Sequence, residues 1–475
     1  MKDYNDLGEN ELELAYLSKN EVQKKDHLKR AFDYFSKTDN CIGWYNLALC
    51  YQYGEGCEMD EEKAIALFEK ASREQYLPAM FQLSRCYLYG KGCKVDQEKG
   101  YQLMCEVANQ NDPVAQYEMF RLLKEGIGTC PDEWLALAYL EEAAKQGYDA
   151  AENELAYYYE TQGQYERMIE YYEKAALKGN SLAQTNLGLC YHEGKGVMMD
   201  PQKALYWYRK ASEQGDAYAD YYIANLYDLT LHDEKEAMKW YERAAKAGVS
   251  EAIHDLAYTY AIHYDYEKAV YWYRKGVEIA NPKSINNLAM FYSYGIYVEK
   301  DIAYAVELYQ KAIALGNSDA YINLGELYYY GDGVKQDYEF AYRCYAAADS
   351  LGNRQVADRI GKCYEHGYGV ARDLKKAFEY FLEGIDYDIP RAYFEVGRFY
   401  ENGLYVKQDL NQALVYYQKA AQLKDSYACL RLAQMNQFDQ PQLALVLIEQ
   451  GLLDDFGNER IKKVLLNLKE ELQSV

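Results

Sequence analysis

The 475-residue chain has few prolines, no long apolar run and no excess of positive charge. With only seven prolines and no Pro/Gly/Ser-rich stretch, the sequence offers no candidate linker between separate domains. It contains no run of 18 apolar residues, so we expect no insertion into a membrane. The formal net charge of −23 argues against nucleic acid as a partner, because such a surface needs basic residues, and against an anionic membrane face.

The sequence also lacks the recognised motifs of catalysis and metal binding. No H-E-x-x-H, G-x-S-x-G, S-x-x-K or G-x-x-x-x-G-K-[ST] motif occurs, and there is no C-x-x-C pair. His254 and His263 come nearest to a metal-ligand spacing, but nine residues of helix rotate the second side chain by about 900°, so the two point apart. We therefore expect no catalytic residue, no cofactor and no metal. The protein is not expected to be an enzyme, and a hydrolase is the least favoured class.

What the chain does contain is a short pattern that recurs along nearly all of it. Its clearest copy is residues 181–215, SLAQTNLGLCYHEGKGVMMDPQKALYWYRKASEQG, in which apolar residues recur at helical spacing until Gly194 and Gly196 allow a turn. Asp200, followed by proline, is typical of an N-cap and predicts the start of a second helix. Gly215 then stands where a left-handed C-cap belongs. The pattern predicts helix, turn, helix, and the pair cannot bury its apolar faces without neighbours.

The same register recurs at steps of 32 to 36 residues and defines twelve repeats, each with one marker residue on its first helix. A small residue usually stands four positions before the marker, and a tyrosine usually stands four positions after it. Small and large residues at fixed positions let helices interlock. We therefore predict an all-α fold, a right-handed α/α superhelix (solenoid) of about twelve helix-turn-helix repeats with helical caps. The markers are Leu47, Leu83, Met119, Leu155, Leu187, Ile223, Leu256, Leu288, Leu324, Ile360, Val396 and Leu432.

The pattern A-x-x-x-L-G-x-x-Y-x-x-G-x-G-V-x-x-D-x-x-K-A-x-x-W-Y-x-K-A resembles the Sel-one-like repeat, a relative of the tetratricopeptide repeat. Residues 181–215 match it almost throughout, and residues 319–351 match it closely. The resemblance covers roughly residues 41–425. It implies adaptor and scaffold work, with partners that differ from protein to protein.

The predicted organisation has three parts. Residues 1–40 form an N-terminal helical cap, residues 41–436 hold the twelve repeats, and residues 437–475 form a C-terminal helical cap. Caps are expected because an open end of a repeat array would expose its core. The repeats at about 150–181 and 217–281 are shorter, lack the glycine pair and are closer to plain tetratricopeptide units.

Eleven cysteines raise the question of a disulfide framework, since some relatives of this repeat class pair cysteines within each repeat. Cys50 and Cys57 form one of two pairs with a seven-residue spacing. However, Cys190 occupies the position of Cys50 in its own repeat and has Val197 in place of Cys57, so these positions are apolar first and cysteine second. The first 17 residues also lack the basic segment and apolar core of a secretory signal. We therefore predict buried thiols and a cytoplasmic location.

The first helices of this repeat class line a concave side, so the residue before each marker is expected to face a groove. Asn186, Asn287 and Asn323 occupy that position and resemble the asparagines by which tetratricopeptide grooves hold a peptide backbone. The alternative, given equal weight, is that they bond neighbouring helix ends and hold the stack. Two tyrosines supply contact area and a hydroxyl, and an arginine follows beside them. The predicted partner-binding residues are Asn186, Asn287, Tyr294, Asn323, Tyr330 and Arg359.

The favoured function is a non-catalytic protein–protein interaction scaffold or adaptor that binds an extended peptide or a partner domain in its concave groove. The alternative is a regulatory or sensor subunit that binds a small ligand in the groove. An acidic chain suits a basic partner, although the charge serves equally to keep a long repeat protein in solution.

Overall fold

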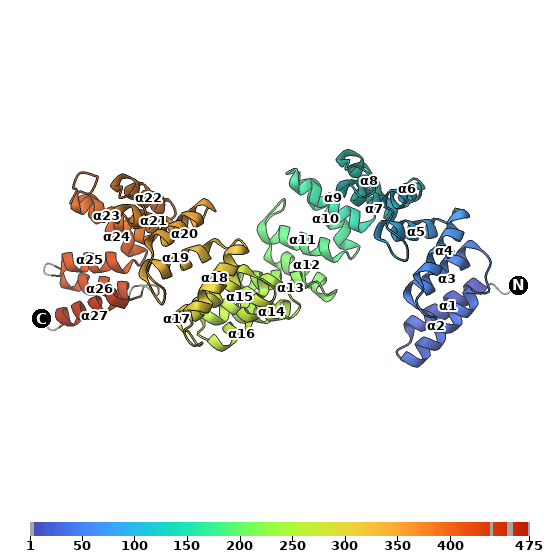
Figure 1. The fold of residues 1–475 in the computed structure, drawn as a ribbon, viewed down its shortest axis with the longest axis horizontal. Coiled ribbons are helices and arrows are strands. Elements are labelled where there is room, and N and C mark those ends of the chain that lie inside the picture. Colours follow the sequence, from blue (N-terminus) through green and yellow to red (C-terminus); the bar gives the residue numbers. More distant parts are fainter. Residues whose placement is uncertain (1–3, 438–439, 454–458, 474–475) are drawn as a thin grey trace. The chain divides into compact units, whose positions relative to one another are not determined.

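The computed structural model describes residues 4–437, 440–453 and 459–473, and every regular element in these ranges is a helix. The all-α prediction is therefore confirmed. Parts of the two predicted caps, residues 1–3, 438–439, 454–458 and 474–475, lie outside the described residues. The chain divides into two compact units, which we call the first unit (Met1–Trp240) and the second unit (Tyr241–Val475), and each is described by itself (Figure 1).

The first unit consists of successive helices in antiparallel pairs, and each helix packs against the next one along the chain. Leu226–Thr230 is a π-helix, and α14 (Glu234–Lys246) includes the boundary with the second unit. The helices before it are α1 (Tyr4–Leu17), α2 (Glu21–Phe35), α3 (Cys41–Tyr53), α4 (Glu61–Arg73), α5 (Leu77–Tyr89), α6 (Gln97–Ala108), α7 (Pro113–Glu125), α8 (Glu133–Lys145), α9 (Asp149–Thr161), α10 (Tyr165–Leu177), α11 (Ser181–Glu193), α12 (Pro201–Glu213) and α13 (Ala217–Asn225).

The second unit follows the same plan, with a short 3₁₀ helix, Arg354–Val356, before one of its first helices. All twelve markers lie on the odd-numbered helices from α3 to α25, as the period predicts. The helices of this unit after α14 are α15 (Ser250–Ile262), α16 (Tyr266–Glu278), α17 (Pro282–Tyr294), α18 (Ile302–Ala314), α19 (Ser318–Tyr330), α20 (Tyr338–Ser350), α21 (Ala357–His366), α22 (Leu374–Asp386), α23 (Pro390–Asn402), α24 (Leu410–Gln422), α25 (Ser426–Asn436), α26 (Pro441–Leu452) and α27 (Glu459–Gln473).

The capping residues explain where the helices begin and end. Asp200 accepts a hydrogen bond at Oδ1 from the backbone N–H of Lys203 at 3.0 Å, which satisfies a free donor at the start of α12. Gly194 ends α11 in the left-handed region with φ of 73°, and Gly196 has φ of 74°. Gly215 follows α12 with φ of 89°, as predicted. These local devices recur along the chain, although α5, α9 and α15 begin without a side-chain cap.

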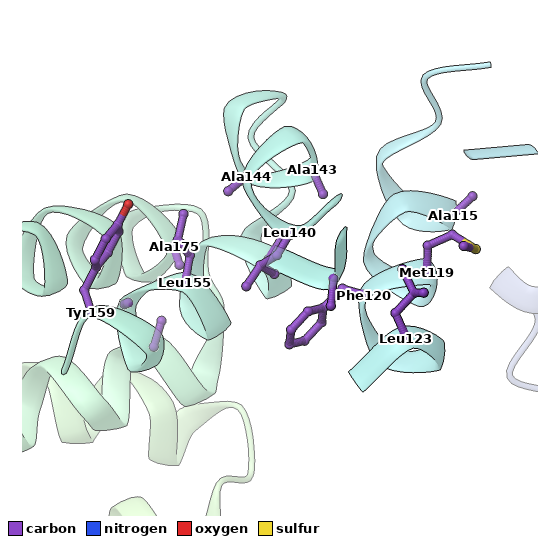
Figure 2. Close-up of a cluster of buried hydrophobic side chains, with 14 of the residues drawn as sticks. Ala115, Met119, Phe120, Leu123, Leu140, Ala143, Ala144, Leu155, Tyr159 and Ala175 are labelled. Atoms are coloured by element: carbon purple, nitrogen blue, oxygen red, sulfur yellow. The ribbon is translucent and has the colours of Figure 1, made fainter. Parts of the chain in front are cut away.

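The core is built where second helices pack on first helices within and between repeats. Figure 2 shows part of it in the first unit, with Leu123 of α7, Leu140 of α8 and Leu155 of α9 among the buried side chains. Six of the eleven cysteines are buried within the repeats. Cys57 donates from Sγ to the backbone oxygen of Cys50 at 3.4 Å, so this seven-residue spacing places a thiol on the end of its own first helix.

The π-helix Leu226–Thr230, which continues directly from α13, was not predicted. This repeat lacks the glycine pair, so the first helix has no residue at which it ends easily in the left-handed region. The turn widens instead, and the backbone N–H of Leu231 bonds to the oxygen of Leu226 at 3.0 Å. His232 then adopts a φ of 54°, the conformation that glycine supplies elsewhere.

Gly188 of α11 is expected to be intolerant of a side chain. A Cβ at this position would lie 2.6 Å from Cδ1 of Tyr208, whose ring is fully buried. Gly188→Ala should therefore lower the free energy of unfolding by about 1–3 kcal/mol through overpacking, although alanine is otherwise favoured over glycine in a helix. Urea unfolding followed by far-ultraviolet circular dichroism measures the effect.

The control for this prediction is the double variant Gly188→Ala/Tyr208→Leu. Removing the ring removes the clash, so the double variant should lose less stability than the sum of the two single variants. Additive losses would show that Gly188 and Tyr208 do not interlock.

Candidate binding groove of the second unit

A groove of about 930 Å³ lies within the second unit and is lined by side chains from successive first helices. The C-terminal ends of α17 and α19, the N-terminal half of α21 and the starts of α23 and α25 all contribute. The second helices α18 and α20 each add one tyrosine. The groove thus draws on five consecutive repeats, and its lining is mainly polar and aromatic.

The structure brings four of the six predicted residues into this groove. Tyr294 from α17, Asn323 and Tyr330 from α19, and Arg359 from α21 all line it. The rings of the two tyrosines are 65% and 64% exposed, so both are accessible from solvent. Whether these residues bind a partner remains a prediction.

The other two predicted residues lie elsewhere. Asn287 does not line the groove, because its Nδ2 donates to the hydroxyl of Tyr273 at 3.2 Å and its Oδ1 accepts from Asn286 at 3.2 Å. Asn186 belongs to the first unit, where it is half-buried and donates to Oδ1 of Asn153 at 3.2 Å. In both cases the amide joins neighbouring side chains within the stack, which was the alternative to a binding role.

Asn323 lines the groove and is also bonded within the stack. Its Nδ2 donates to Oδ1 of Asn286 at 3.0 Å, so a chain of amides links α16, α17 and α19. Within the part of the chain that the structure describes, Oδ1 of Asn323 accepts no hydrogen bond, and it remains available at the groove.

Charges in the groove are balanced, with four carboxylates and four cations in its lining. Arg359 donates from Nε to Glu326 and from Nη1 to Asp358, each at 2.8 Å. The remaining carboxylates are also paired, Asp425 with Arg391 at 3.3 Å and Asp332 with Lys300 at 2.9 Å. The side of each carboxylate that a ligand would meet is therefore already partly neutralised.

Asp358 is the most buried of these groups, with 4% of its surface exposed. Burial acts to raise its pKa, but the neighbouring charges of Arg359, Lys362 and Arg391 outweigh burial and hold the pKa below its ordinary value. In turn, the charge of Asp358 is the main cause of the raised pKa of Arg359. This pair is therefore ionised at neutral pH and fixes the guanidinium at the floor of the groove.

Sequence reasoning missed a series of ion pairs between neighbouring first helices. Arg398 of α23 contacts Glu365 of α21 and donates from Nε to Glu395 at 2.8 Å. Both carboxylates are 5% exposed. Glu326 and Arg359, like Glu365 and Arg398, are separated by 33 residues, close to one repeat. A search for acidic and basic residues one repeat apart could have found them.

The described residues can also be considered for a metal site and for a membrane-spanning helix. Among those residues, no group of three or more His, Cys, Asp or Glu side chains is arranged to hold a metal ion. No helix within the described ranges is both long and apolar enough to cross a membrane.

A family model of the Sel1 repeat matches eleven segments of the chain. These are the first eleven of the twelve predicted repeats, and the twelfth, which begins with α25, is not matched. The matched residues are 45–76, 77–112, 113–148, 149–180, 181–216, 217–249, 250–278, 282–317, 318–353, 356–386 and 390–425.

Two proteins of Schizosaccharomyces pombe are among the similar sequences, chitin synthase regulatory factors 3 and 4. They are 26% and 27% identical over 200 and 127 residues, which cover 39% and 26% of this chain. The alignments span only 18% and 20% of those two proteins. A solved structure of a protective antigen from uropathogenic Escherichia coli, with an SLR fold, is 22% identical over 94% of each chain, with a TM-score of 0.64. The similarity to this E. coli protein shows a shared fold and nothing further.

Loss of Arg398 should destabilise the second unit strongly, because two buried carboxylates would lose their nearest cationic partner and keep only Lys362 and His366, each at 3.7 Å. We expect Arg398→Met to lower the free energy of unfolding by about 3–5 kcal/mol. Lys375→Met is the matched control, since its partner Glu379 is 3.7 Å away and both side chains are exposed, and it should cost at most about 1 kcal/mol. Urea unfolding measures both. Equal losses would contradict a stabilising role for the buried pairs.

Glu401 gives a prediction for pH. Burial raises its pKa, but hydrogen bonds from Arg431 and Tyr417 outweigh burial, and the pKa lies below the ordinary value of 4.5. A lowered folded-state pKa contributes stability above pH 4.5 that is lost as the pH falls through the folded-state value. Glu401→Gln should therefore be less stable than wild type at neutral pH, and the difference should shrink below about pH 4.5.

The measurement is thermal unfolding across this range of pH, with Glu379→Gln as the control for an exposed carboxylate. Glu379→Gln should differ little from wild type throughout. A stability difference for Glu401→Gln that stays constant on acidification would be inconsistent with the lowered pKa.

Proposed function

The chain belongs to the Sel1-repeat family, and from this premise we propose that it is a non-catalytic scaffold that binds an extended segment of a partner protein in the groove of the second unit. Proteins built from Sel1 repeats generally act as protein-interaction scaffolds. They are typically non-catalytic. We further propose a cytoplasmic location for the protein.

The observation that carries the proposal is the composition of the groove. Five consecutive repeats contribute to one groove, so a ligand that contacts its whole length must be extended. Tyr294 and Tyr330 present largely exposed rings, which give contact area at a low cost in side-chain entropy. Asn323 offers an amide oxygen that can accept a backbone N–H. Aromatic anchors beside fixed polar groups are typical of peptide recognition.

The names of the fission yeast relatives support a regulatory variant of the same proposal. Those two proteins are regulatory factors of chitin synthase, and this chain aligns with a fifth or less of each. We therefore carry over only the general idea of a protein that acts by binding another. A small-ligand sensor is the second candidate, because about 930 Å³ also falls within the usual volume of small-molecule sites.

The proposal is tested with the double variant Tyr294→Ala/Tyr330→Ala of the full chain. Both side chains are exposed at the groove, so their loss should weaken partner capture at least about tenfold with little effect on folding. Affinity capture followed by quantitative mass spectrometry compares the variant with wild type. Tyr271→Ala is the matched control, because Tyr271 is 55% exposed on α16 and does not line the groove.

The expected result is a set of proteins that wild type and Tyr271→Ala capture equally and that the double variant loses. Equal capture by all three would contradict binding in this groove. If a metabolite instead raises the unfolding temperature of wild type but not of the double variant, the groove serves a small ligand.

A further inference from the structure

A buried tyrosine recurs at the same position of the second helices. Its ring packs against a first helix, and its hydroxyl lies at the far end of the ring. Burying a hydroxyl without a hydrogen bond costs about 1–3 kcal/mol, so each of these groups needs a partner. The tyrosines with at most 2% of their surface exposed are Tyr172, Tyr208, Tyr273, Tyr309, Tyr345 and Tyr417.

Four of these six hydroxyls form a hydrogen bond inside the protein, and a fifth, that of Tyr309, lies close to Ser293. Three of the five partners stand sixteen residues earlier, on the first helix of the same repeat, as with Tyr417 and Glu401. The others are supplied by a nearby residue of a first helix. The pairs are Tyr172 with Glu160 at 3.1 Å, Tyr208 with His192 at 3.4 Å, Tyr273 with Asn287 at 3.2 Å, Tyr309 with Ser293, and Tyr417 with Glu401 at 2.6 Å.

Tyr345 is the exception. The position sixteen residues earlier holds Tyr329, and the two rings make an aromatic contact with centroids 6.4 Å apart. Among the residues that the structure describes, none forms a hydrogen bond with the Tyr345 hydroxyl, although only 1% of the side chain is exposed. Tyr345 lines the groove, and its hydroxyl is not among the buried side-chain atoms that lack a partner, so solvent or a ligand in the groove can reach it.

The ring of Tyr345 is held firmly in place. It packs over Gly325 of α19, where an added Cβ would lie 2.6 Å from its Cε1. Burial, together with the negative charge of Glu326, raises the pKa of Tyr345, so the hydroxyl stays protonated and can donate. A fixed donor at the groove is a source of specificity, since a bound ligand group that cannot accept the bond leaves the donor unpaired.

Other groups that line the same groove offer both donors and acceptors. Arg359 uses Nε and Nη1 for Glu326 and Asp358, and its Nη2 makes no hydrogen bond within the described residues. On the acceptor side, Oδ1 of Asn323 and Oε2 of Glu326 accept none there either. Arg359 and Glu326 already form an ion pair with each other. An anionic ligand group would therefore be repelled by Glu326, and a cationic one would be repelled by Arg359.

We propose that Tyr345, Arg359 and Asn323 form a subsite for the side-chain carboxamide of an asparagine or glutamine in the bound segment. The carboxamide oxygen accepts from Tyr345 and Arg359, and its NH₂ group donates to Asn323 or Glu326. A neutral group with both a donor and an acceptor matches the donors and the acceptors of this subsite. A carboxylate could only accept hydrogen bonds, and an ammonium group could only donate them. The inference rests on the proposed binding of an extended polypeptide in the groove.

The test begins with a random peptide library displayed on phage and selected on the full wild-type chain. Peptides whose binding is lost in Tyr294→Ala/Tyr330→Ala are synthesised, and their affinities are measured by fluorescence anisotropy. We expect them to share an asparagine or glutamine at one position. Replacing it by leucine or glutamate should weaken binding to wild type by about tenfold or more, the factor that corresponds to one lost hydrogen bond.

Tyr345→Phe is the diagnostic variant and Tyr417→Phe is its matched control. Tyr345→Phe should bind the glutamine and leucine peptides with nearly equal affinity, while Tyr417→Phe should keep the wild-type preference. In thermal unfolding, Tyr417→Phe should be less stable than wild type because it loses the bond to Glu401, whereas Tyr345→Phe should unfold at the wild-type temperature. This second measurement needs no ligand.

The outcomes separate this inference from the function on which it rests. Groove-dependent peptides without a shared asparagine or glutamine, or an equal preference in wild type and Tyr345→Phe, would overturn the carboxamide subsite and leave the scaffold function standing. An unfolding temperature lowered as much by Tyr345→Phe as by Tyr417→Phe would also overturn it, since the hydroxyl would then have an internal partner. A library that yields no groove-dependent peptide would overturn both.

Discussion

The structure depends on the contact between a small residue of a first helix and a large ring of its second helix. Gly361 against Phe381 and Gly397 against Tyr417 are two examples, where an added Cβ would lie 2.5 and 2.8 Å from the ring. Where a ring occupies this position, it fills the space between the two helices, although Met104 and Leu140 take its place in two repeats. What meets the far end of the ring is then decided by a single residue of the first helix. The repeat therefore fixes where the helices and rings lie, and the residues that differ between repeats determine where a binding site can form.

The period, the helix pairs and the residues that cap single helices could be predicted because they depend on local chemistry. Asp200 caps a helix through its own backbone neighbours, and Gly194 ends one through its own φ. The π-helix Leu226–Thr230 could not be predicted, because the loss of a glycine does not say how the helix ends instead. The ion pairs of Arg398 depend on which residues of neighbouring helices meet, and that is known only once the register is placed in space.

The candidate site was predicted in part for the same reason. The position before each marker was identified from the sequence, but it lies where neighbouring first helices meet. The side chain of Asn287 is therefore hydrogen-bonded to Asn286 and Tyr273. Asn323, one repeat later, has a side-chain oxygen at the groove without such a bond from the described residues. The identity of the residue does not distinguish the two cases. The difference comes from the side chains that surround each asparagine, and these vary from repeat to repeat.

The total charge of the chain is a poor guide to what this groove binds. The value of −23 suggested a basic partner, yet each carboxylate that lines the groove has a cation beside it. A basic segment would have to displace Arg359 or Arg391 from partners with which they are already in contact, and would gain little by exchanging one pair for another. Unpaired groups govern recognition instead. In this groove the hydroxyl of Tyr345 and the amide oxygen of Asn323 are neutral, which favours polar ligand groups without net charge, while the ammonium of Lys424 has no ion pair among the described residues.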